Sequence, residues 1–225
     1  MKLVLLGPPG AGKGTLAGLL KKKFKIKHIS TGDMLRVEMK KQTKLGKEIK
    51  RFIESGALVP DEVVTKLLEN TMKAIARQKQ GFMLDGYPRT QHQAEDLDRI
   101  LTKFKIPIRC TLNLEASLPI IVQRLSGRRI CRNCGTPYHI INRPPKIEGV
   151  CDVCRGELYQ RTDDNAKTIK NRMKVYQANT RPILNYYRSQ KKLHTLNADE
   201  DAEHVVARLI KILNEDKKSH SHKNA

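Results

Sequence analysis

The sequence predicts an α/β protein in which helices flank a central parallel sheet. Short apolar runs suited to buried strands alternate along the chain with longer stretches whose apolar residues recur at helical spacing. A glycine-rich loop joins the first apolar run, residues 3–6, to the first helical stretch. The 225 residues suffice for one large core and an inserted module. We therefore expect a three-layer fold whose ligands gather at the carboxyl ends of the strands.

The glycine-rich loop, residues 7–15, fits the frame of a phosphate-binding P-loop, because Gly7, Gly12 and Lys13 have the Gly-x4-Gly-Lys spacing. Glycines allow successive backbone N–H groups to point at an anion beside a helix N-terminus, and the lysine adds a positive charge. A simple glycine- and proline-rich turn is the alternative, which the flanking strand and helix disfavour. Gly14 stands where the frame has serine or threonine, and Thr15 follows it. We therefore expect the metal ion to be held largely through phosphates and water.

The remaining elements are predicted in order from apolar spacing and capping residues. Consecutive or alternating apolar residues predict strands, an apolar face with a period of 3.6 predicts helices, and Ser, Thr or Asp precedes several helices as a cap. The expected elements are a helix at 16–24, a strand at 26–29, helices at 30–39, 46–53 and 61–75, a strand at 81–85, a helix at 90–104, a strand at 108–114, helices at 118–125 and 163–188, a strand at 193–196 and a helix at 205–213. Asp163 is the candidate cap of the long helix. Residues 215–225 have almost no apolar side chain, so we expect a disordered tail.

Four of the five cysteines form two pairs, Cys131-x2-Cys134 and Cys151-x2-Cys154, with sixteen residues between the pairs. Each pair places two thiolates on one tight turn, which suits tetrahedral zinc, and four thiolates leave no position open for substrate. We expect a structural zinc site in an insert that begins near residue 127. Two disulfides and an iron centre are the alternatives, and a reducing compartment disfavours the disulfides. Cys110 lies in an expected strand and is interpreted as a buried apolar residue.

The chain carries a formal net charge of +21, from 44 basic and 23 acidic residues. This charge suits polyanionic ligands, namely nucleotides, nucleic acids or acidic surfaces, and does not choose between them. The lysines within residues 21–27 fit a solvated helix end whose dipole favours cations. No signal-peptide core and no stretch of about 18 apolar residues is present, so we expect a cytoplasmic chain with reduced cysteines and no membrane contact.

Five arginines stand where a phosphate group could be bound. They are Arg89 after a strand-end acid, Arg124 and Arg128 near the start of the insert, and Arg161 and Arg172 where the insert returns. Phosphoryl transfer needs positioning and positive charge, and the arginine fork binds phosphate oxygens bidentately. For Arg124 and Arg128, complementing a helix C-terminal dipole is an equally good explanation. Asp163 alone is more simply a cap than a catalytic group.

Six motifs together resemble those of the adenylate kinases, a family of nucleoside monophosphate kinases, in the long-lid form that carries zinc. They are GPPGAGKGT at 7–15, STGDMLR at 30–36, GALVPD at 56–61, DGYPRT at 85–90, LSGRR at 125–129 and RTDD at 161–164. The resemblance runs in order from residue 1 to about residue 213. It implies reversible transfer of a phosphoryl group from Mg-ATP to AMP, giving two ADP, under a closing lid. Gly14-Thr15 is the form that this family itself uses.

The resemblance also implies roles for individual residues. The ATP site would comprise Gly10, Ala11, Gly12, Lys13, Gly14, Thr15 and Arg124, and the AMP site Thr31, Arg36, Leu58, Val59, Gly86, Arg89 and Gln93. The catalytic positions would be Lys13, Arg89, Arg128, Arg161 and Arg172, with Asp85 near hydrated Mg2+ and with Asp163 and Asp164 helping to hold the closed lid. The structural Zn2+ would be bound by Cys131, Cys134, Cys151 and Cys154.

The same resemblance implies the organisation of the chain and its partners. It divides the chain into a P-loop core (1–30, 60–126 and 161–214), a helical segment for the nucleoside monophosphate (31–59), a zinc-stabilised lid (127–160) and the tail (215–225). The expected ligands are ATP, AMP and ADP. We expect a monomer with no specific nucleic-acid partner and no membrane partner.

Two other functions are compatible with these residues. A kinase for UMP, CMP or GMP would use the same loop and arginines, although Thr31 and Gln93 favour adenine by their family match. A nucleic-acid-binding protein of the zinc-ribbon type would suit the net charge and the paired cysteines. Against it, the chain has only six tyrosines, four phenylalanines and no tryptophan, and we expect none of these to form a base-stacking surface.

Overall fold

The computed structural model describes the backbone of residues 1–221 and the side chains of residues 1–214. Its centre is a five-stranded sheet in the order β2-β3-β1-β4-β8, with parallel pairing throughout. The strands are β1 (Lys2–Leu6), β2 (Lys27–Ser30), β3 (Phe82–Asp85), β4 (Cys110–Glu115) and β8 (Leu193–Asn197). This arrangement confirms the predicted α/β class and its parallel sheet.

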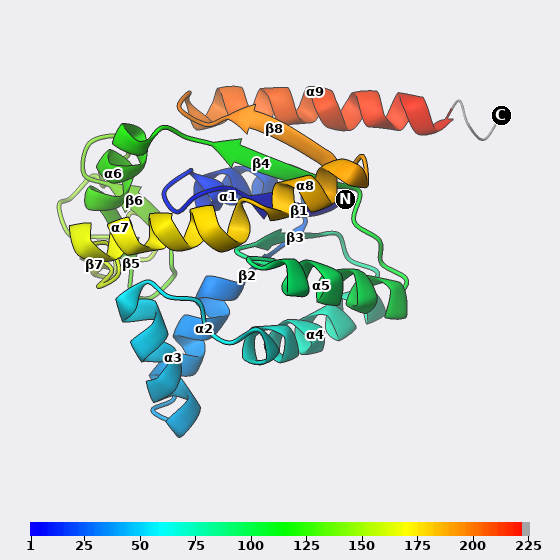
Figure 1. Ribbon diagram of the computed structural model, residues 1–225. Coiled ribbons are helices and arrows are strands. Elements are labelled where there is room, and N and C mark those ends of the chain that lie inside the picture. Colours follow the sequence, from blue (N-terminus) through cyan, green and yellow to red (C-terminus); the bar gives the residue numbers. More distant parts are fainter. Residues whose placement is uncertain (222–225) are drawn as a thin grey trace.

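Helices cover both faces of the sheet (Figure 1). They are α1 (Lys13–Phe24), α2 (Thr31–Lys40), α3 (Lys44–Ser55), α4 (Asp61–Arg77), α5 (Gln91–Lys103), α6 (Leu118–Ser126), α7 (Ala166–Val175), α8 (Ile183–Ser189) and α9 (Ala202–Ser221). Successive residues of a strand point to opposite faces, so Leu3 and Leu5 of β1 pack in one apolar cluster and Val4 and Leu6 in the other. The first cluster contains residues of α1 and α9, and the second those of α4, α5 and α8. The chain therefore forms three layers.

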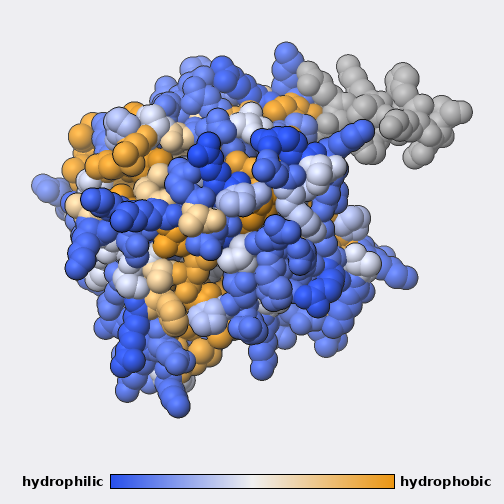
Figure 2. Space-filling view, viewed as in Figure 1, coloured by the Kyte–Doolittle hydropathy of each residue, from blue (hydrophilic) through white to orange (hydrophobic). Residues whose placement is uncertain are grey.

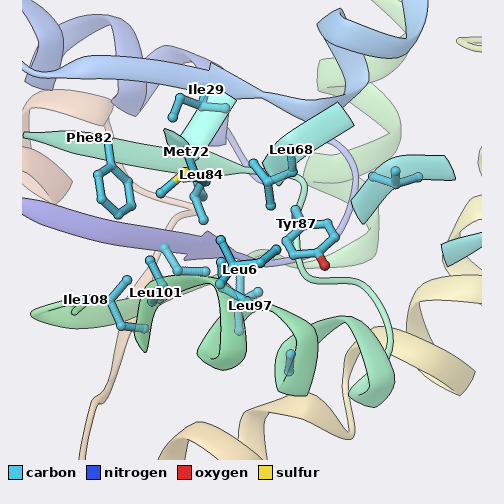
Figure 3. Packing of buried hydrophobic residues seen from close by; sticks show 14 of the residues in the cluster. Leu6, Ile29, Leu68, Met72, Phe82, Leu84, Tyr87, Leu97, Leu101 and Ile108 are labelled. Carbon is cyan, nitrogen blue, oxygen red and sulfur yellow. The ribbon is translucent and has the colours of Figure 1, made fainter. Parts of the chain in front are cut away.

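The larger apolar cluster fixes the carboxyl ends of two neighbouring strands. In Figure 3, Leu6 from the end of β1 lies among Leu68 of α4, Leu84 of β3 and Leu97 of α5. Leu6 is 3% exposed and the other three are fully buried. Burying side chains of this size contributes about 1.5–3 kcal/mol each. This packing holds the points where the glycine-rich loop leaves β1 and where Asp85 ends β3.

A small antiparallel sheet forms a separate unit at the end of the molecule towards which the strands of the central sheet point (Figure 1). Its strands are β5 (Arg128–Cys131), β6 (Pro137–His139) and β7 (Leu158–Tyr159), in the order β6-β5-β7. The buried cluster inside it has only four residues, and two of them are Cys131 and Cys151. Apolar burial alone is therefore slight in this unit, which we call the cysteine module.

The long helix predicted at 163–188 differs from the structure in its start and in its continuity. The helix begins at Ala166, and Asn165 rather than Asp163 is its N-cap, because the Asn165 side chain accepts a hydrogen bond from the N–H of Thr168. A π-helical turn, η1 (Tyr176–Thr180), follows α7, and α8 starts after Pro182. Pro182 has no backbone N–H with which to continue the helical hydrogen bonds, so the interruption is expected there.

The predicted disordered tail also differs from the structure in part, because α9 continues to Ser221. Lysine and glutamate favour helix, and the helical backbone bonds need no burial to form. Residues 222–225 lie outside the described part of the chain, so the prediction for them stays a prediction. Across residues 1–221, no helix combines the length and the apolar character needed to cross a bilayer.

Candidate active site and metal centre

The glycine-rich loop between β1 and α1 leaves backbone donors for an anion. Gly12, the N-cap of α1, has φ of 87° and no side chain that could cap the helix. The first N–H groups of α1 therefore have no capping acceptor from this residue, and a phosphate is a natural partner for them. Gly7 has φ of 134°, and a Cβ on it would lie 2.5 Å from the carbonyl oxygen of Leu114. Only glycine fits the loop at that point.

Lys13 lies across the loop that precedes it. Its Nζ donates hydrogen bonds to the carbonyl oxygens of Gly7 and Pro8, each at 2.8 Å. Burial lowers the pKa of Lys13 to about 8, the charge of Asp85 opposes this, and the charges of Arg89 and other nearby arginines lower the pKa further. The ammonium is thus partly desolvated and close to several other cations.

Asp85 ends β3 beside the loop and has a partner that sequence analysis missed. Nε2 of His28, on the neighbouring strand β2, lies 3.2 Å from Oδ2 of Asp85. Burial would raise the pKa of Asp85, but the hydrogen bond with His28 and the charge of Lys13 outweigh it and hold that pKa below its usual value. Asp85 is therefore an ionised carboxylate. Only the order of the strands reveals His28, because 57 residues separate the pair.

The turn after Asp85 carries two further predicted residues, Gly86 and Arg89. The Thr31 hydroxyl, at the start of α2, donates to the Gly86 carbonyl at 2.8 Å, and so does Nε of Arg89 at 2.9 Å. The Gln93 amide oxygen accepts from the N–H of Arg89 at 2.8 Å, and its NH2 donates to Asp61 at 2.7 Å. This network connects α2, α4 and α5 and orients Arg89. Asp61 was expected to cap this helix, but it is the first residue of α4, whose N-cap is Pro60, and its side chain instead anchors Gln93.

Where the chain returns from the cysteine module, a buried pair of acids holds two arginines. Arg128 donates to both carboxylate oxygens of Asp164, at 2.8 and 2.5 Å. Arg172 donates to Asp163 at 3.2 Å and to Asp164 at 3.4 Å. The Asp164 side chain is completely buried, so these paired acids act as fixed supports for the arginines. This role replaces the capping predicted for Asp163, because Asn165 is the cap of α7.

Arg161 connects this region to α2. One of its terminal nitrogens lies 3.5 Å from Oδ1 of Asp33, which also accepts from Arg36 at 2.9 Å. Within residues 1–214, the buried Nε of Arg161 has no hydrogen-bond partner. A buried donor without a partner is costly, and a phosphate oxygen would satisfy it.

The cations share one strongly positive region. Burial lowers the pKa of Arg89 to about 10, and the charge of Arg172 lowers it further. Burial likewise lowers the pKa of Arg161 to about 10, with the charges of Arg36 and Arg128 adding to the effect. Several buried cations repel one another in this region, so the region is suited to binding a polyanion.

Three of the predicted site residues, namely Arg124, Leu58 and Val59, lie outside this cluster of cations. Arg124 donates a long hydrogen bond, 3.5 Å, to the Glu200 carbonyl. Burial lowers its pKa, while the charges of Asp199 and Asp201 oppose that shift, so its surroundings are acidic. Leu58 and Val59 lie on the link between α3 and α4, where Val59 is 6% exposed.

The four paired cysteines come together in the cysteine module. Their Sγ atoms all lie within 4.8 Å of one another, and the closest separations are 3.4 Å for Cys131 with Cys154 and 3.6 Å for Cys134 with Cys151. Zinc–sulfur bonds of about 2.3 Å in a tetrahedron require sulfur–sulfur distances of about 3.8 Å, so the cluster fits zinc.

The two cysteine turns close in the same way. The N–H of Gly135 donates to the carbonyl of Cys131 at 3.1 Å, and the N–H of Arg155 to that of Cys151 at 2.9 Å. Gly135 and Arg155 are both left-handed, with φ of 71° and 59°. Two equivalent turns that face each other are the arrangement expected of a four-thiolate metal site.

Comparisons with known proteins agree with this geometry. The family model described as adenylate kinase matches residues 5–192. The chain is 48% identical over 213 residues to an adenylate kinase of Caldicellulosiruptor bescii, covering 95% of this chain and 99% of that protein. It is 48% identical over 207 residues to one of Carboxydothermus hydrogenoformans, covering 92% and 96%, and 47% identical over 213 residues to one of Listeria innocua, covering 95% and 99%.

Proposed function

We propose a residue-level mechanism from the premise that this chain belongs to the adenylate kinase family and is an enzyme that transfers a phosphoryl group between ATP and AMP. One observation carries the proposal, the convergence of Lys13, Arg89 and Arg172 on a desolvated region beside Asp85. Burial lowers the pKa of each of these cations, and in Lys13 and Arg89 the charge of Arg172 adds to the effect. The phosphates of two nucleotides are the kind of anion that would relieve this repulsion.

On the ATP side, we assign the phosphates to Gly10, Ala11, Gly12, Lys13, Gly14 and Thr15. The backbone N–H groups at the start of α1 bind phosphate oxygens, because Gly12 offers them no side-chain cap. Lys13 exchanges the carbonyl oxygens of Gly7 and Pro8 for a phosphate, which is the stronger acceptor. Arg124 is assigned to the same site, because one terminal nitrogen of its guanidinium lies 3.8 Å from where a Cβ on Gly12 would stand.

On the AMP side, we assign the nucleotide to the surface between α2 and the turn after β3. The proposed residues are Thr31, Arg36, Leu58, Val59, Gly86, Arg89 and Gln93. Arg89 binds the phosphate, because two hydrogen bonds hold it in place before the ligand arrives. Leu58 and Val59 offer backbone and apolar contacts beside the base. Gln93 keeps one amide group engaged with Asp61, which fixes its orientation.

Transfer itself is proposed to need no general base. Lys13, Arg89, Arg128, Arg161 and Arg172 spread positive charge over the phosphoryl group as it moves from one oxygen to another. The pairing of Arg128 and Arg172 with buried acids supports this role, because it positions both guanidinium groups in advance. When bound with ATP, Mg2+ supplies neutralising charge between the phosphates. Asp85, an ionised carboxylate beside Lys13, is the residue proposed to hold it through water.

The cysteine module is proposed to be the lid, residues 127–160, with Zn2+ bound by Cys131, Cys134, Cys151 and Cys154. Four thiolates complete the coordination of zinc, so the ion supplies structure and no catalysis. A closed lid excludes water, so that AMP rather than solvent receives the phosphoryl group. Asp163 and Asp164 lie beside the lid, and their pairing with Arg128 and Arg172 supports a role in holding it closed.

The proposal extends to the organisation of the whole molecule. Residues 1–30, 60–126 and 161–214 act as the core, and residues 31–59 as the arm that binds the monophosphate. All the groups assigned above come from one chain, which supports a working monomer. The proposed ligands of the protein are ATP, AMP and ADP, and its proposed location is the cytoplasm.

The decisive experiment is product analysis by chromatography with Mg-ATP and each of AMP, CMP, UMP and GMP offered separately. We expect ADP to form rapidly with AMP alone, and ADP by itself to give back ATP and AMP. Transfer to CMP or UMP would leave the loop and arginines in place but overturn the adenine-site assignment of Thr31 and Gln93. Absence of transfer to all four, in folded and metal-replete protein, would overturn the mechanism.

A further inference from the structure

A row of basic residues lies at the edge of the central sheet opposite the candidate active site. In a parallel sheet, the connections from helices into strands all meet at the amino edge, and the catalytic groups assigned above are at the carboxyl edge. The connecting segments are residues 21–27 before β2, 77–81 before β3, 103–109 before β4 and 188–192 before β8. Together they contain thirteen lysines and arginines and not one aspartate or glutamate.

The order of the strands places these segments side by side. Across the sheet the order is β2-β3-β1-β4-β8, and β1 itself begins with Lys2 at the chain terminus. Neighbouring strands lie about 4.8 Å apart, so the row spans about 19 Å. Figure 2 shows hydrophilic residues along the right-hand rim, on the side where the strands of Figure 1 begin. Among the described side chains, Lys103 pairs with Glu69 at 2.7 Å.

Four lysines of this row have a backbone conformation that is unfavourable for any residue with a Cβ atom. Each of the four helices that lead into a strand of the central sheet is followed by an exposed lysine in the left-handed conformation, where glycine is the usual residue. These are Lys25, Lys79, Lys105 and Lys191, with φ between 50° and 55°. Of the helices that lead into no strand, α3 ends with Gly56 at φ of 76°, and α2 is followed by Gln42 at φ of 58°. Complementing helix dipoles does not explain the difference, because a lysine inside the last turn does that without strain.

We propose that this amino edge, defined by Lys25, Lys79, Lys105, Lys191 and the basic residues around them, binds the phosphate backbone of a nucleic-acid double helix without reading its sequence. A linear row of cations matches a linear polyanion, which carries one charge about every 1.7 Å along a DNA duplex. A single strand fits less well, because Phe24 and Phe104 pack against the apolar clusters and offer no stacking surface. A membrane fits less well, because the exposed large apolar residues of the described chain all lie in other segments.

The test measures binding of a fluorescent 20-base-pair DNA duplex to the full chain from 50 to 200 mM KCl. The edge variant carries Lys25→Gly, Lys79→Gly, Lys105→Gly and Lys191→Gly. Glycine suits these left-handed positions, so the variant is expected to keep its melting temperature. The control variant loses the same charge from exposed helical lysines, through Lys44→Gln, Lys47→Gln, Lys167→Gln and Lys170→Gln.

The edge variant should bind at least about tenfold more weakly at 100 mM KCl, and its slope of log affinity against log salt should fall by about 3 to 4. The control variant should change the slope by less than about 1. A blunt-ended RNA duplex should give the same pattern, because phosphates alone are contacted. Equal weakening of both variants would overturn the proposal, since it would mean that net charge alone attracts the duplex.

Two further results would also overturn it. Inhibition of phosphoryl transfer by the duplex in competition with ATP would place the duplex at the candidate active site. Loss by the edge variant of binding to vesicles containing phosphatidylserine, with duplex binding unchanged, would make the edge a membrane surface. The expected result is unchanged turnover while the duplex is bound, because the candidate active site lies at the opposite edge of the sheet. That outcome can be observed whatever the acceptor nucleotide proves to be.

Discussion

The positive region around Lys13, Arg89 and Arg172 and the cysteine module are held together in different ways, although both gather groups far apart in the sequence. The residues of the positive region stand on strands and helices anchored in two large apolar clusters. In the module, the buried cluster has four residues, and two of these are metal-ligand candidates. Apolar packing therefore fixes the positive region, whereas we expect a bound metal to supply most of the order in the module.

This difference predicts that substitutions in the two regions affect different properties, activity in the first region and stability in the second. Changes to a cation in the positive region are expected to remove an interaction with the ligand and to leave the apolar clusters intact. Changes to a sulfur in the module are expected to remove the metal that holds its turns together. The following predictions test that separation, beginning with the largest expected effect.

Removal of the metal should unfold the cysteine module and leave the central sheet folded. Structural zinc contributes on the order of 10 kcal/mol in small domains, far more than the four-residue cluster can. After chelation, we expect hydrogen-exchange protection in β5 and β6 to fall at least about 10³-fold, while that in β1 and β3 changes less than about threefold. Cys151→Ser should give the same pattern. Protein purified under reducing conditions without stoichiometric metal would contradict this prediction.

Arg89→Lys should reduce turnover by a factor on the order of 10²–10³ with little change in ATP binding. The reason is geometric, because lysine cannot reproduce both the hydrogen bond to the Gly86 carbonyl and a bidentate phosphate contact. Steady-state kinetics and ATP titration measure the two effects. Arg181→Lys, at an exposed position, serves as the control and should leave turnover unchanged. Near-normal turnover in Arg89→Lys would remove this residue from the site.

ATP binding should weaken as the pH rises through the lowered pKa of Lys13, about 8. Above that pKa the ligand-free protein holds a neutral lysine, so binding must take up a proton. The dissociation constant should therefore rise roughly eightfold from pH 7.5 to pH 9. The effect on folding has the opposite sign. Between pH 8 and 10.5 the unfolded chain keeps a proton on Lys13 that the folded chain has released, so the free energy of unfolding rises with pH over this range. A dissociation constant that stays constant over this range, measured by calorimetry, would refute the prediction.

Asn165→Ala should lower the free energy of unfolding by about 1 kcal/mol, the usual effect of losing a helix cap. Asn165 lies where the chain passes from the module into α7, the helix that carries Arg172. Denaturant unfolding compares this variant with Asn165→Asp, which retains a capping oxygen and should change stability little. If Asn165→Ala were neutral, the cap would contribute nothing and the start of α7 would depend on the paired acids before it.

Short-range patterns could be predicted from sequence, and most boundaries were close. The spacing of Gly7, Gly12 and Lys13 predicted the loop at the start of α1, and the capping residue Thr90 predicted the start of α5. The cap of α7 was wrong by two residues, because Asp163 and Asn165 have equivalent capping chemistry and only the observed hydrogen bond distinguishes them. The extension of α9 past residue 214 was missed, because apolar content does not report the helix propensity of polar residues.

The sequence by itself determined the strands of the central sheet, the glycine-rich loop and the paired cysteines, because each depends on residues within a few positions of one another. Only the tertiary structure decided which distant charges meet. His28 reaches Asp85 across 57 positions, and Arg128 reaches Asp164 across 36. The basic row likewise exists only because the strand order brings four separate connections to one edge. The physical reason is that the order of the strands is set by apolar burial, which is non-directional. The charged groups then lie beside whichever residues this order brings near them.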